Sequence, residues 1–276
     1  MQSRKEPSGN WKDMVYQSYV SSGHIRSRGG TAEEHLRERR AYFETIIRRH
    51  FPKDRSARVL DIGCGHGALL YFLGGQGYTN VQGVDGSREQ VELARQLGIA
   101  GVELADAESF IRSRESESAE VVALFDVLEH LTRQEAFDLL AEVRRVLAPG
   151  GICIGHVPNA GGIFGARIRY GDLTHEQAFT ASSVSQMFGA LRFGKTVCFE
   201  DKPVIHGVKS LVRRILWELG SAPVRLLFIA ETGGGGAILS QNLLFVARRQ
   251  ERTETTVDQP SNSTLQSSAG ASARSD

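Results

Sequence analysis

Residues 59–67 read VLDIGCGHG, in which a short apolar strand that carries Asp61 runs into glycines at every second position. The apolar run at residues 68–73 then predicts the start of a helix. Glycines at such a turn let the backbone bend sharply and let a ligand press against bare main chain. The helix that follows offers free N–H groups at its N-terminus. The stretch therefore predicts a nucleotide-type ligand site at the carboxyl end of a strand.

The spacing of these glycines differs from that of two common phosphate-binding loops. A dinucleotide fingerprint reads G-x-G-x-x-G, and the loop of NTPases needs G-K-[ST]. Here the glycines read G-x-G-x-G, and Ala68 and Leu69 follow the last of them where the NTPase loop would have Lys and Ser or Thr. Asp61, just before the first glycine, favours a ligand with a positive charge at that point over a pyrophosphate.

Acidic residues recur at the ends of the next two predicted strands. Asp85 ends the strand at residues 81–85, where a carboxylate can accept two hydrogen bonds from a ribose diol. Ser87 is typical of the N-cap of the following helix. Asp106 lies just past the third strand and could accept a hydrogen bond from the exocyclic amine of adenine, with the N–H of Ala107 nearby.

Strand-like and helix-like segments continue to alternate beyond this point. A fourth strand at 121–125 ends at DVLEH, and a helix at 133–147 is stopped by Pro-Gly-Gly before a fifth strand at 152–157. Two further strand-like runs occupy 196–199 and 243–247. The alternation predicts an α/β fold with a mostly parallel, doubly wound sheet.

At this point the chain resembles the class I S-adenosylmethionine-dependent methyltransferases. The matching stretches are VLDIGCGHG, GVDGS, ADAESF, DVLEHL and LAPGG, in family order and at family spacing across roughly residues 55–160. The resemblance implies a seven-stranded Rossmann-like sheet with an antiparallel last strand, and S-adenosyl-L-methionine as cofactor. The residues that it implies for cofactor binding are Asp61, Gly63, Cys64, Gly65, Gly67, Asp85, Gly86, Ser87, Asp106, Ala107 and Asp126.

Composition agrees with a globular enzyme. The chain has 276 residues, of which 41% are hydrophobic and 24% charged. Its net charge of +1 gives no indication of nucleic-acid binding. Three scattered cysteines do not make a disulfide framework, and the polar N-terminus shows no signal peptide, so we expect a cytoplasmic protein.

The sequence predicts additions around the core domain. Residues 1–50 are expected to form a helical extension with helices at 11–21 and 32–50, the second either packed on the sheet edge or acting as a lid over the cofactor. Residues 51–250 are expected to form the methyltransferase domain. Residues 201–241 are expected to form a helical insertion, and residues 251–276 a disordered tail. Within the insertion, an apolar helix face at 208–217 is followed by a second apolar run at 224–230. The basic amphipathic segment at 207–230 favours either packing as a subdomain or peripheral contact with a membrane.

Two histidines are candidates for the base that would take a proton from an acceptor hydroxyl. His130 follows the fourth strand, and His175 with Glu176 lies in the polar loop after the fifth. His130 could instead pin its loop. A metal site formed by Asp126, Glu129 and these histidines is the alternative, but no second Glu-His or His-x-His pair supports it, so we predict no metal.

Residues of the same loop suggest how the acceptor is recognised. Arg167 and Arg169 could bind a carboxylate or phosphate, and Tyr170 could stack on a sugar or ring. The stretch 156–180 resembles bacterial methyltransferases of cell-surface polysaccharide and related pathways. We therefore predict O-methylation of a sugar, glycan or other small-molecule hydroxyl, with no nucleic-acid partner. The alternatives are a quinone or lipid-linked acceptor at the membrane surface, or a non-catalytic cofactor-binding protein.

Overall fold

The computed structural model describes residues 11, 12, 15 and 31–251. The predicted tail after residue 251 and most of a helix predicted at 11–21 lie outside the described residues. Within the described part, the predicted helix at 32–50 is present as α4, Ala32–His50, which begins with a capping box formed by Thr31 and Glu34.

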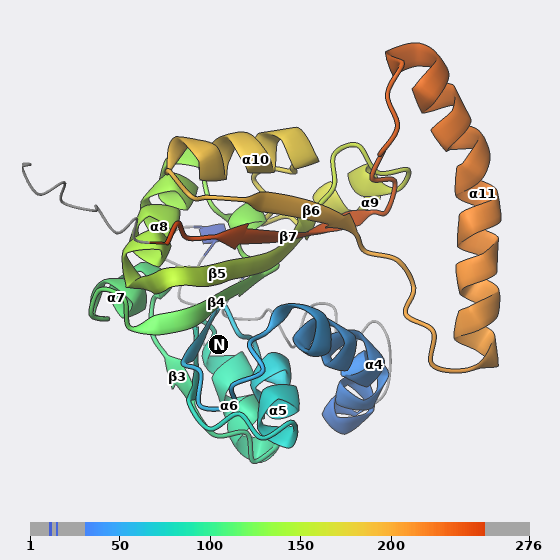
Figure 1. Cartoon of the computed structure of the whole chain (residues 1–276). Helices are drawn as coiled ribbons and strands as arrows, with labels where there is room; N and C mark the ends of the chain where they lie inside the picture. The colour runs from blue at the N-terminus through green and yellow to red at the C-terminus, as the bar shows by residue number, and fades with distance from the viewer. Residues whose placement is uncertain (1–10, 13–14, 16–30, 252–276) are drawn as a thin grey trace, which may run out of the picture.

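A seven-stranded sheet forms the centre of the molecule, with the strand order β3-β2-β1-β4-β5-β7-β6 (Figure 1). The pairs among β1 to β5 are parallel, whereas β7 is antiparallel to both β5 and β6. This arrangement confirms the predicted fold class. The strands are β1 Val59–Ile62, β2 Val81–Asp85, β3 Val102–Leu104, β4 Ala119–Phe125, β5 Leu147–Pro158, β6 Thr196–Glu200 and β7 Asn242–Arg248.

Helices cover both faces of the sheet and bury two separate apolar clusters (Figure 1). Helices α4, α5 and α6 pack on one face, and α7, α8 and α10 pack on the other. Successive residues of β4 point to opposite faces of the sheet: Val122 packs in the cluster under α7, α8 and α10, and Ala123 packs in the cluster under α4, α5 and α6. The remaining helices are α5 Ala68–Gly75, α6 Arg88–Gln96, α7 Ala107–Arg112, the 3-10 turn Leu128–His130, α8 Arg133–Val146, α9 Gly165–Arg169, α10 Ala181–Ala190 and α11 Val208–Thr232.

Two segments differ from the sequence prediction. The fifth strand begins at Leu147 rather than at 152, because Leu147 already pairs with Ala119 of β4. The predicted turn is present as an irregularity inside the strand, where Gly150 has φ of 76° and the register to β4 shifts before Ile152. The two apolar runs of the insertion form one continuous helix, α11, with Pro223 inside it. Figure 1 shows α11 standing at the edge of the molecule, beside the end of the sheet formed by β6 and β7.

Candidate cofactor and acceptor site

The glycine loop joins β1 to α5, as predicted, and its glycines adopt conformations that other residues rarely adopt. Gly63 has φ of 67°, and a Cβ added there would lie 2.7 Å from Val127 Cγ2. Gly67 has φ of 78° and is the N-cap of α5, with no side chain capping the helix. The first backbone N–H groups of α5 are therefore not capped by that residue, which suits a loop that receives a ligand.

Asp85 holds this loop in shape. Its Oδ2 accepts a hydrogen bond from the Gly65 backbone N at 2.8 Å, and its Oδ1 accepts one from the Ser87 backbone N at 2.8 Å. Each carboxylate oxygen has capacity for one more hydrogen bond. Asp85 can therefore order the loop and bind a ribose diol together. Ser87 caps α6, as predicted, by accepting from Gln90 N, and Gly86 lies between the two.

Asp61 is the most buried carboxylate of this region, with 3% of its surface exposed. Burial, and then the negative charge of Asp85, raise the pKa of Asp61 well above its usual range. A cationic group beside Asp61 would relieve both effects. Burial also raises the pKa of the Cys64 thiol, so this cysteine stays protonated and is not a nucleophile.

The other predicted cofactor contacts lie at the same edge of the sheet. Asp106 follows β3 and caps α7 through Oδ1, which accepts from Ser109 N at 2.9 Å, and Ala107 is the first residue of that helix. In open α/β sheets, ligands bind outside the carboxyl ends of the strands where the strand order reverses. Here that point lies between β1 and β4. The narrow glycine turn, the buried Asp61 and the acceptor capacity of Asp85 fit the amino group and ribose of S-adenosylmethionine.

Asp126 takes part in a hydrogen-bonded network of ionised side chains that the sequence did not predict. Its Oδ1 lies 2.5 Å from His156 Nδ1, and His156 Nε2 lies 3.0 Å from Asp201 Oδ2. Burial alone would lower the pKa of His156, but the two carboxylates raise it to about 10. Burial alone would raise the pKa of Asp126, but the charge and hydrogen bond of His156 lower it to about 2. Asp126 is thus held by His156 beside the predicted cofactor position.

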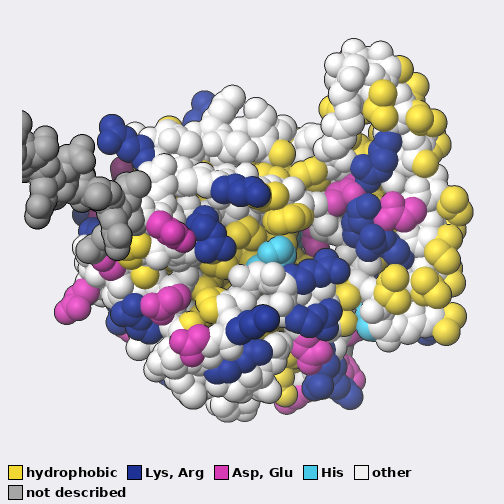
Figure 2. All heavy atoms as spheres, viewed as in Figure 1, with side chains coloured by type: hydrophobic (Ala, Val, Ile, Leu, Met, Phe, Trp, Pro, Cys, Tyr) yellow, Lys and Arg dark blue, Asp and Glu magenta, His cyan; other side chains and the backbone are white. Residues whose placement is uncertain are grey.

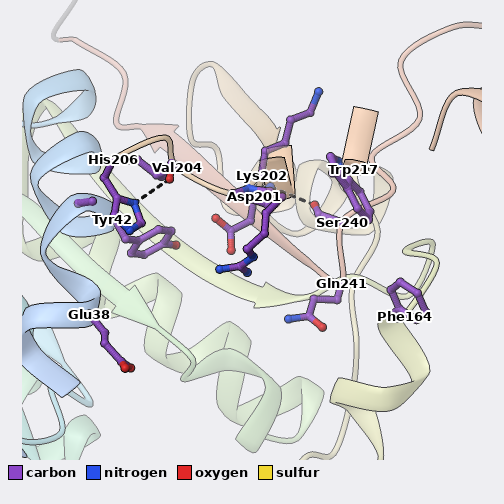
Figure 3. Close-up of a pocket in the computed structure, with 13 residues that line it drawn as sticks. Glu38, Tyr42, Phe164, Asp201, Lys202, Val204, His206, Trp217, Ser240 and Gln241 are labelled. Carbon is purple, nitrogen blue, oxygen red and sulfur yellow. Dashed lines mark hydrogen bonds between the residues drawn. The ribbon is translucent and has the colours of Figure 1, made fainter. Parts of the chain in front are cut away.

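A pocket of about 410 Å³ lies beside Asp201, between α4, α11 and the segment after β6. Its lining includes Tyr42, Phe164, Asp201, Lys202, Arg213 and Trp217 (Figure 3). The Tyr42 ring packs edge-on to that of His156, with centroids 6.3 Å apart. Burial, and then the negative charges of Asp201 and Asp126, raise the pKa of Tyr42. Sequence patterns gave no sign of this pocket because its walls come from distant segments.

The three residues predicted to bind the acceptor do not line this pocket. Arg167 and Arg169 lie on the short helix α9, and Arg169 Nη2 donates to the Glu176 backbone O at 2.7 Å. Tyr170 is 80% exposed, and the Arg169 guanidinium lies 5.1 Å from its ring centroid. They form an exposed loop surface, and a role in acceptor binding stays a prediction.

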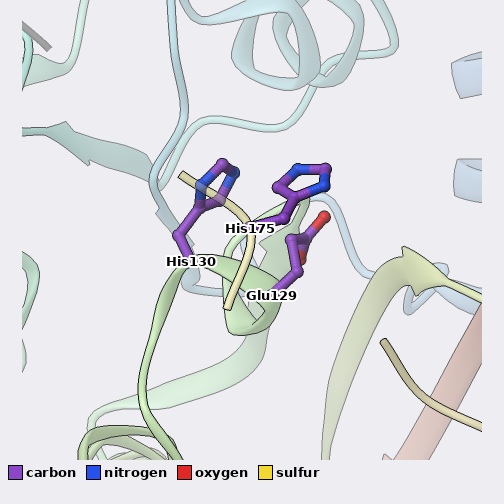
Figure 4. Close-up of side chains that lie close together, drawn as sticks. All are labelled: Glu129, His130 and His175. Carbon is purple, nitrogen blue, oxygen red and sulfur yellow. The ribbon is translucent and has the colours of Figure 1, made fainter. Parts of the chain in front are cut away.

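The structure brings the two candidate histidines together. The rings of His130 and His175 have centroids 4.7 Å apart, and Glu129 lies beside them (Figure 4). His130 Nδ1 lies 2.8 Å from Thr174 Oγ1, and His175 Nδ1 lies 3.0 Å from the Ile168 backbone O. Burial, and then the nearby His175, lower the pKa of His130 to about 4. His130 is therefore neutral at physiological pH.

Glu129 and Glu176 have different surroundings. Glu129 is 1% exposed, and burial followed by the charge of Asp126 raises its pKa well above the usual range. Glu176 Oε1 instead pairs with Lys12 Nζ at 2.9 Å, and Lys12 Nζ also donates to the His130 backbone O at 3.0 Å. Lys12 thus links the N-terminal segment to both candidate catalytic positions.

One ligand atom each from Glu129, His130 and His175 lie within 4.8 Å of one another. Carboxylate oxygen and imidazole nitrogen together are ligands for several divalent ions. The raised pKa of Glu129 favours its neutral form, which is a poor ligand. The absence of a metal stays a prediction from the sequence.

Comparison with known proteins identifies the family. The sequence profile of a family described as a methyltransferase domain matches residues 34–193, which is more than half of the chain. The chain belongs to this methyltransferase family. No curated protein matches this methyltransferase. Its sheet order and glycine loop are those expected of the class I S-adenosylmethionine-dependent enzymes, and the family supports S-adenosylmethionine as the cofactor.

Solved structures share the fold of this methyltransferase at low sequence identity. A S-adenosylmethionine-dependent methyltransferase from Archaeoglobus fulgidus is 22% identical with a TM-score of 0.59, covering 79% of this chain and 97% of its own. The putative methyltransferase in complex with the Trm112 activator from Haloferax volcanii is 15% identical with a TM-score of 0.60, covering 86% and 98%. Phosphoethanolamine N-methyltransferase 2 of Haemonchus contortus, solved with S-adenosylmethionine, is 17% identical with a TM-score of 0.60, covering 86% and 60%.

Proposed function

We propose that the chain is an S-adenosylmethionine-dependent O-methyltransferase that acts on a hydroxyl of a sugar, glycan or other small molecule. When bound, the cofactor supplies a methyl group activated on a sulfonium. The glycine loop, Asp61 and Asp85 would hold the cofactor, with Asp106 and Ala107 near its adenine. The remaining task of the protein is to align the hydroxyl and to accept its proton.

The observation that carries this proposal is the hydrogen-bonded state of His130. Thr174 Oγ1 donates its only proton to Asp172 Oδ1 at 2.6 Å, so it must accept at His130 Nδ1. Nδ1 therefore carries the imidazole proton, and the basic lone pair lies on Nε2. A neutral histidine whose tautomer is set in this way suits the removal of a hydroxyl proton. His175 and Glu176 are the second candidates for this step.

A quinone or lipid-linked acceptor is the second candidate substrate. The specific observation in its favour is the pocket beside α11, whose walls include the aromatic rings of Tyr42, Phe164 and Trp217. Arg213 and Lys202 in the same walls would suit an anionic group on the acceptor.

We place the enzyme in the cytoplasm because all three cysteines are free, as is usual in a reducing compartment.

The test is formation of S-adenosylhomocysteine in the presence of separate acceptor panels. One panel holds sugars and glycans, the second holds quinols with apolar chains, and the third holds primary amines. Turnover with the sugar and glycan panel or with the quinol panel supports O-methylation, and the panel that is methylated distinguishes the two acceptor classes. Turnover with amines alone would contradict O-methylation. Tight cofactor binding without turnover in any panel would support the non-catalytic alternative.

A further inference from the structure

Helix α11 is attached to the rest of the molecule by its polar side. The buried and half-buried residues of α11 all lie on that side; they are Ser210, Arg214, Trp217, Glu218, Ser221, Val224 and Arg225. Lys202 Nζ pairs with Glu218 Oε1 at 2.9 Å, and Arg225 Nη2 pairs with Glu200 Oε1 at 2.6 Å. Figure 2 shows basic and acidic side chains gathered on the side of α11 that faces the body. The contact to the body is thus mainly polar, with Trp217 and Val224 as its half-buried apolar members.

The opposite side of α11 is apolar and faces solvent. This outer face of α11 consists of Val208, Val212, Leu216, Leu219, Leu226 and Leu227, whose exposed fractions range from 48% to 79%. Figure 2 shows hydrophobic side chains along the side of α11 that points away from the sheet. An amphipathic helix in a globular protein normally turns its apolar side inward. The reversed orientation leaves an apolar strip about 30 Å long without a covering partner in the described part of the chain.

The charges at the border of this strip are basic. The exposed charged residues of α11 are Lys209 and Arg213 in its first two turns and Glu231 in its last turn, beyond the strip, whereas Arg214, Glu218 and Arg225 are half-buried. The Arg213 side chain also lines the pocket beside α11. Basic side chains at the margin of an apolar face are typical of helices that lie on anionic lipid surfaces. Among the described residues, no helix is both long and apolar enough to cross a membrane.

We propose that the outer face of α11 binds an anionic lipid surface, with the helix lying in the plane of the interface. Charge favours lipid over a second copy of the chain. The outer face of a second copy, from Val208 to Leu227, would offer Lys209 and Arg213 no exposed acid, because Glu218 is half-buried and Glu231 lies beyond Leu227. Anionic headgroups would neutralise both residues while the leucines enter the acyl boundary. The proposal does not depend on which acceptor is methylated, or on methyl transfer at all.

Flotation of the purified full chain with vesicles tests this proposal. One set of vesicles is phosphatidylcholine, and the other is an equimolar mixture of phosphatidylcholine and phosphatidylglycerol. The wild type should float with the anionic vesicles and much less with the neutral ones. The double variant Leu216→Glu, Leu219→Glu should partition onto the anionic vesicles at least about tenfold more weakly. Each substitution removes the favourable transfer of a leucine side chain from water into the lipid. Tyr71→Glu is the matched control, since Tyr71 is 44% exposed on α5, and should float like the wild type.

A second variant separates the charge contribution from the apolar one. Lys209→Gln combined with Arg213→Gln should remove most of the preference for anionic over neutral vesicles. Wild-type protein that floats with neither vesicle, or a Leu216→Glu, Leu219→Glu variant that floats like the wild type, would overturn the proposal. So would a wild-type dimer in light scattering that this variant converts to a monomer, because the face would then belong to a second copy. Circular dichroism establishes that each variant is folded.

Discussion

His156 Nδ1 lies 2.5 Å from Asp126 Oδ1, and this pair fixes the ends of two neighbouring strands at the predicted cofactor edge. Asp126 follows β4 directly and has φ of 56°, an unusual backbone conformation for a residue other than glycine. The second nitrogen of His156, a β5 residue, binds Asp201, which follows β6 and lines the pocket. One histidine therefore connects the predicted cofactor edge to that pocket.

Replacing His156 by glutamine should destabilise the protein, because Asp126 and Asp201 lose the positive charge between them. We expect a loss of about 1.5–3 kcal/mol in the free energy of unfolding, as for hydrogen bonds to charged groups. The pKa of His156 is raised to about 10, so its contribution is complete below pH about 6.5 and is lost as pH rises toward 10. Denaturant unfolding from pH 7 to 10 should thus show a steeper decline for wild type than for His156→Gln. Parallel declines would contradict the charged state of His156.

Replacing His130 by alanine should slow methyl transfer without weakening cofactor binding. A general base contributes about 10²–10⁴-fold, so kcat should fall by that factor. The pKa of His130 is lowered to about 4, so the wild-type kcat/KM should stay level from neutral pH down to about pH 5 and fall below that. An acidic limb centred near the usual histidine pKa of about 6.5 would contradict this environment.

Chelation is the control that separates a base from a metal site at the same residues. Incubation with a chelator should leave the rate unchanged. A rate that is lost on chelation and restored by a divalent ion would replace the base assignment by a metal site formed by Glu129, His130 and His175. Full activity of both His130→Ala and His175→Ala would remove histidine from the reaction.

Thr174 should act as a positioning residue for His130. Thr174→Val keeps the shape of this buried side chain but removes the oxygen that accepts from His130 Nδ1. The imidazole proton is then no longer held on Nδ1, and we expect kcat to fall about tenfold, the equivalent of one hydrogen bond, with cofactor affinity unchanged. Thr174→Ser should restore most of the rate. A merely structural role would instead lower the melting temperature and leave the rate per folded molecule intact.

The sequence predicted the fold and the glycine loop well because both depend on local patterns. Alternating strands and helices, the glycine spacing and the Ser87 cap can each be recognised within about ten residues. His156 was missed as a partner of Asp126, because β5 and β4 bring these residues together only through their register. The pocket was missed for the same reason. The orientation of α11 was also beyond prediction, because periodicity shows that a helix has two sides but not which side meets the protein.

The central claim, that the loop at residues 63–67 binds S-adenosylmethionine, is tested most directly by calorimetric titration of a matched pair of glycine variants. Gly65 and Gly77 have φ of 56° and 87°, and an added Cβ would come no closer than 3.7 Å to protein at Gly65 and would meet nothing within 4 Å at Gly77. Gly65→Asp and Gly77→Asp therefore carry a similar backbone cost of about 1–2 kcal/mol. Wild type and Gly77→Asp should bind S-adenosylmethionine with micromolar affinity and not bind NAD, whereas Gly65→Asp should show no binding. Equal affinity in both variants would contradict the site.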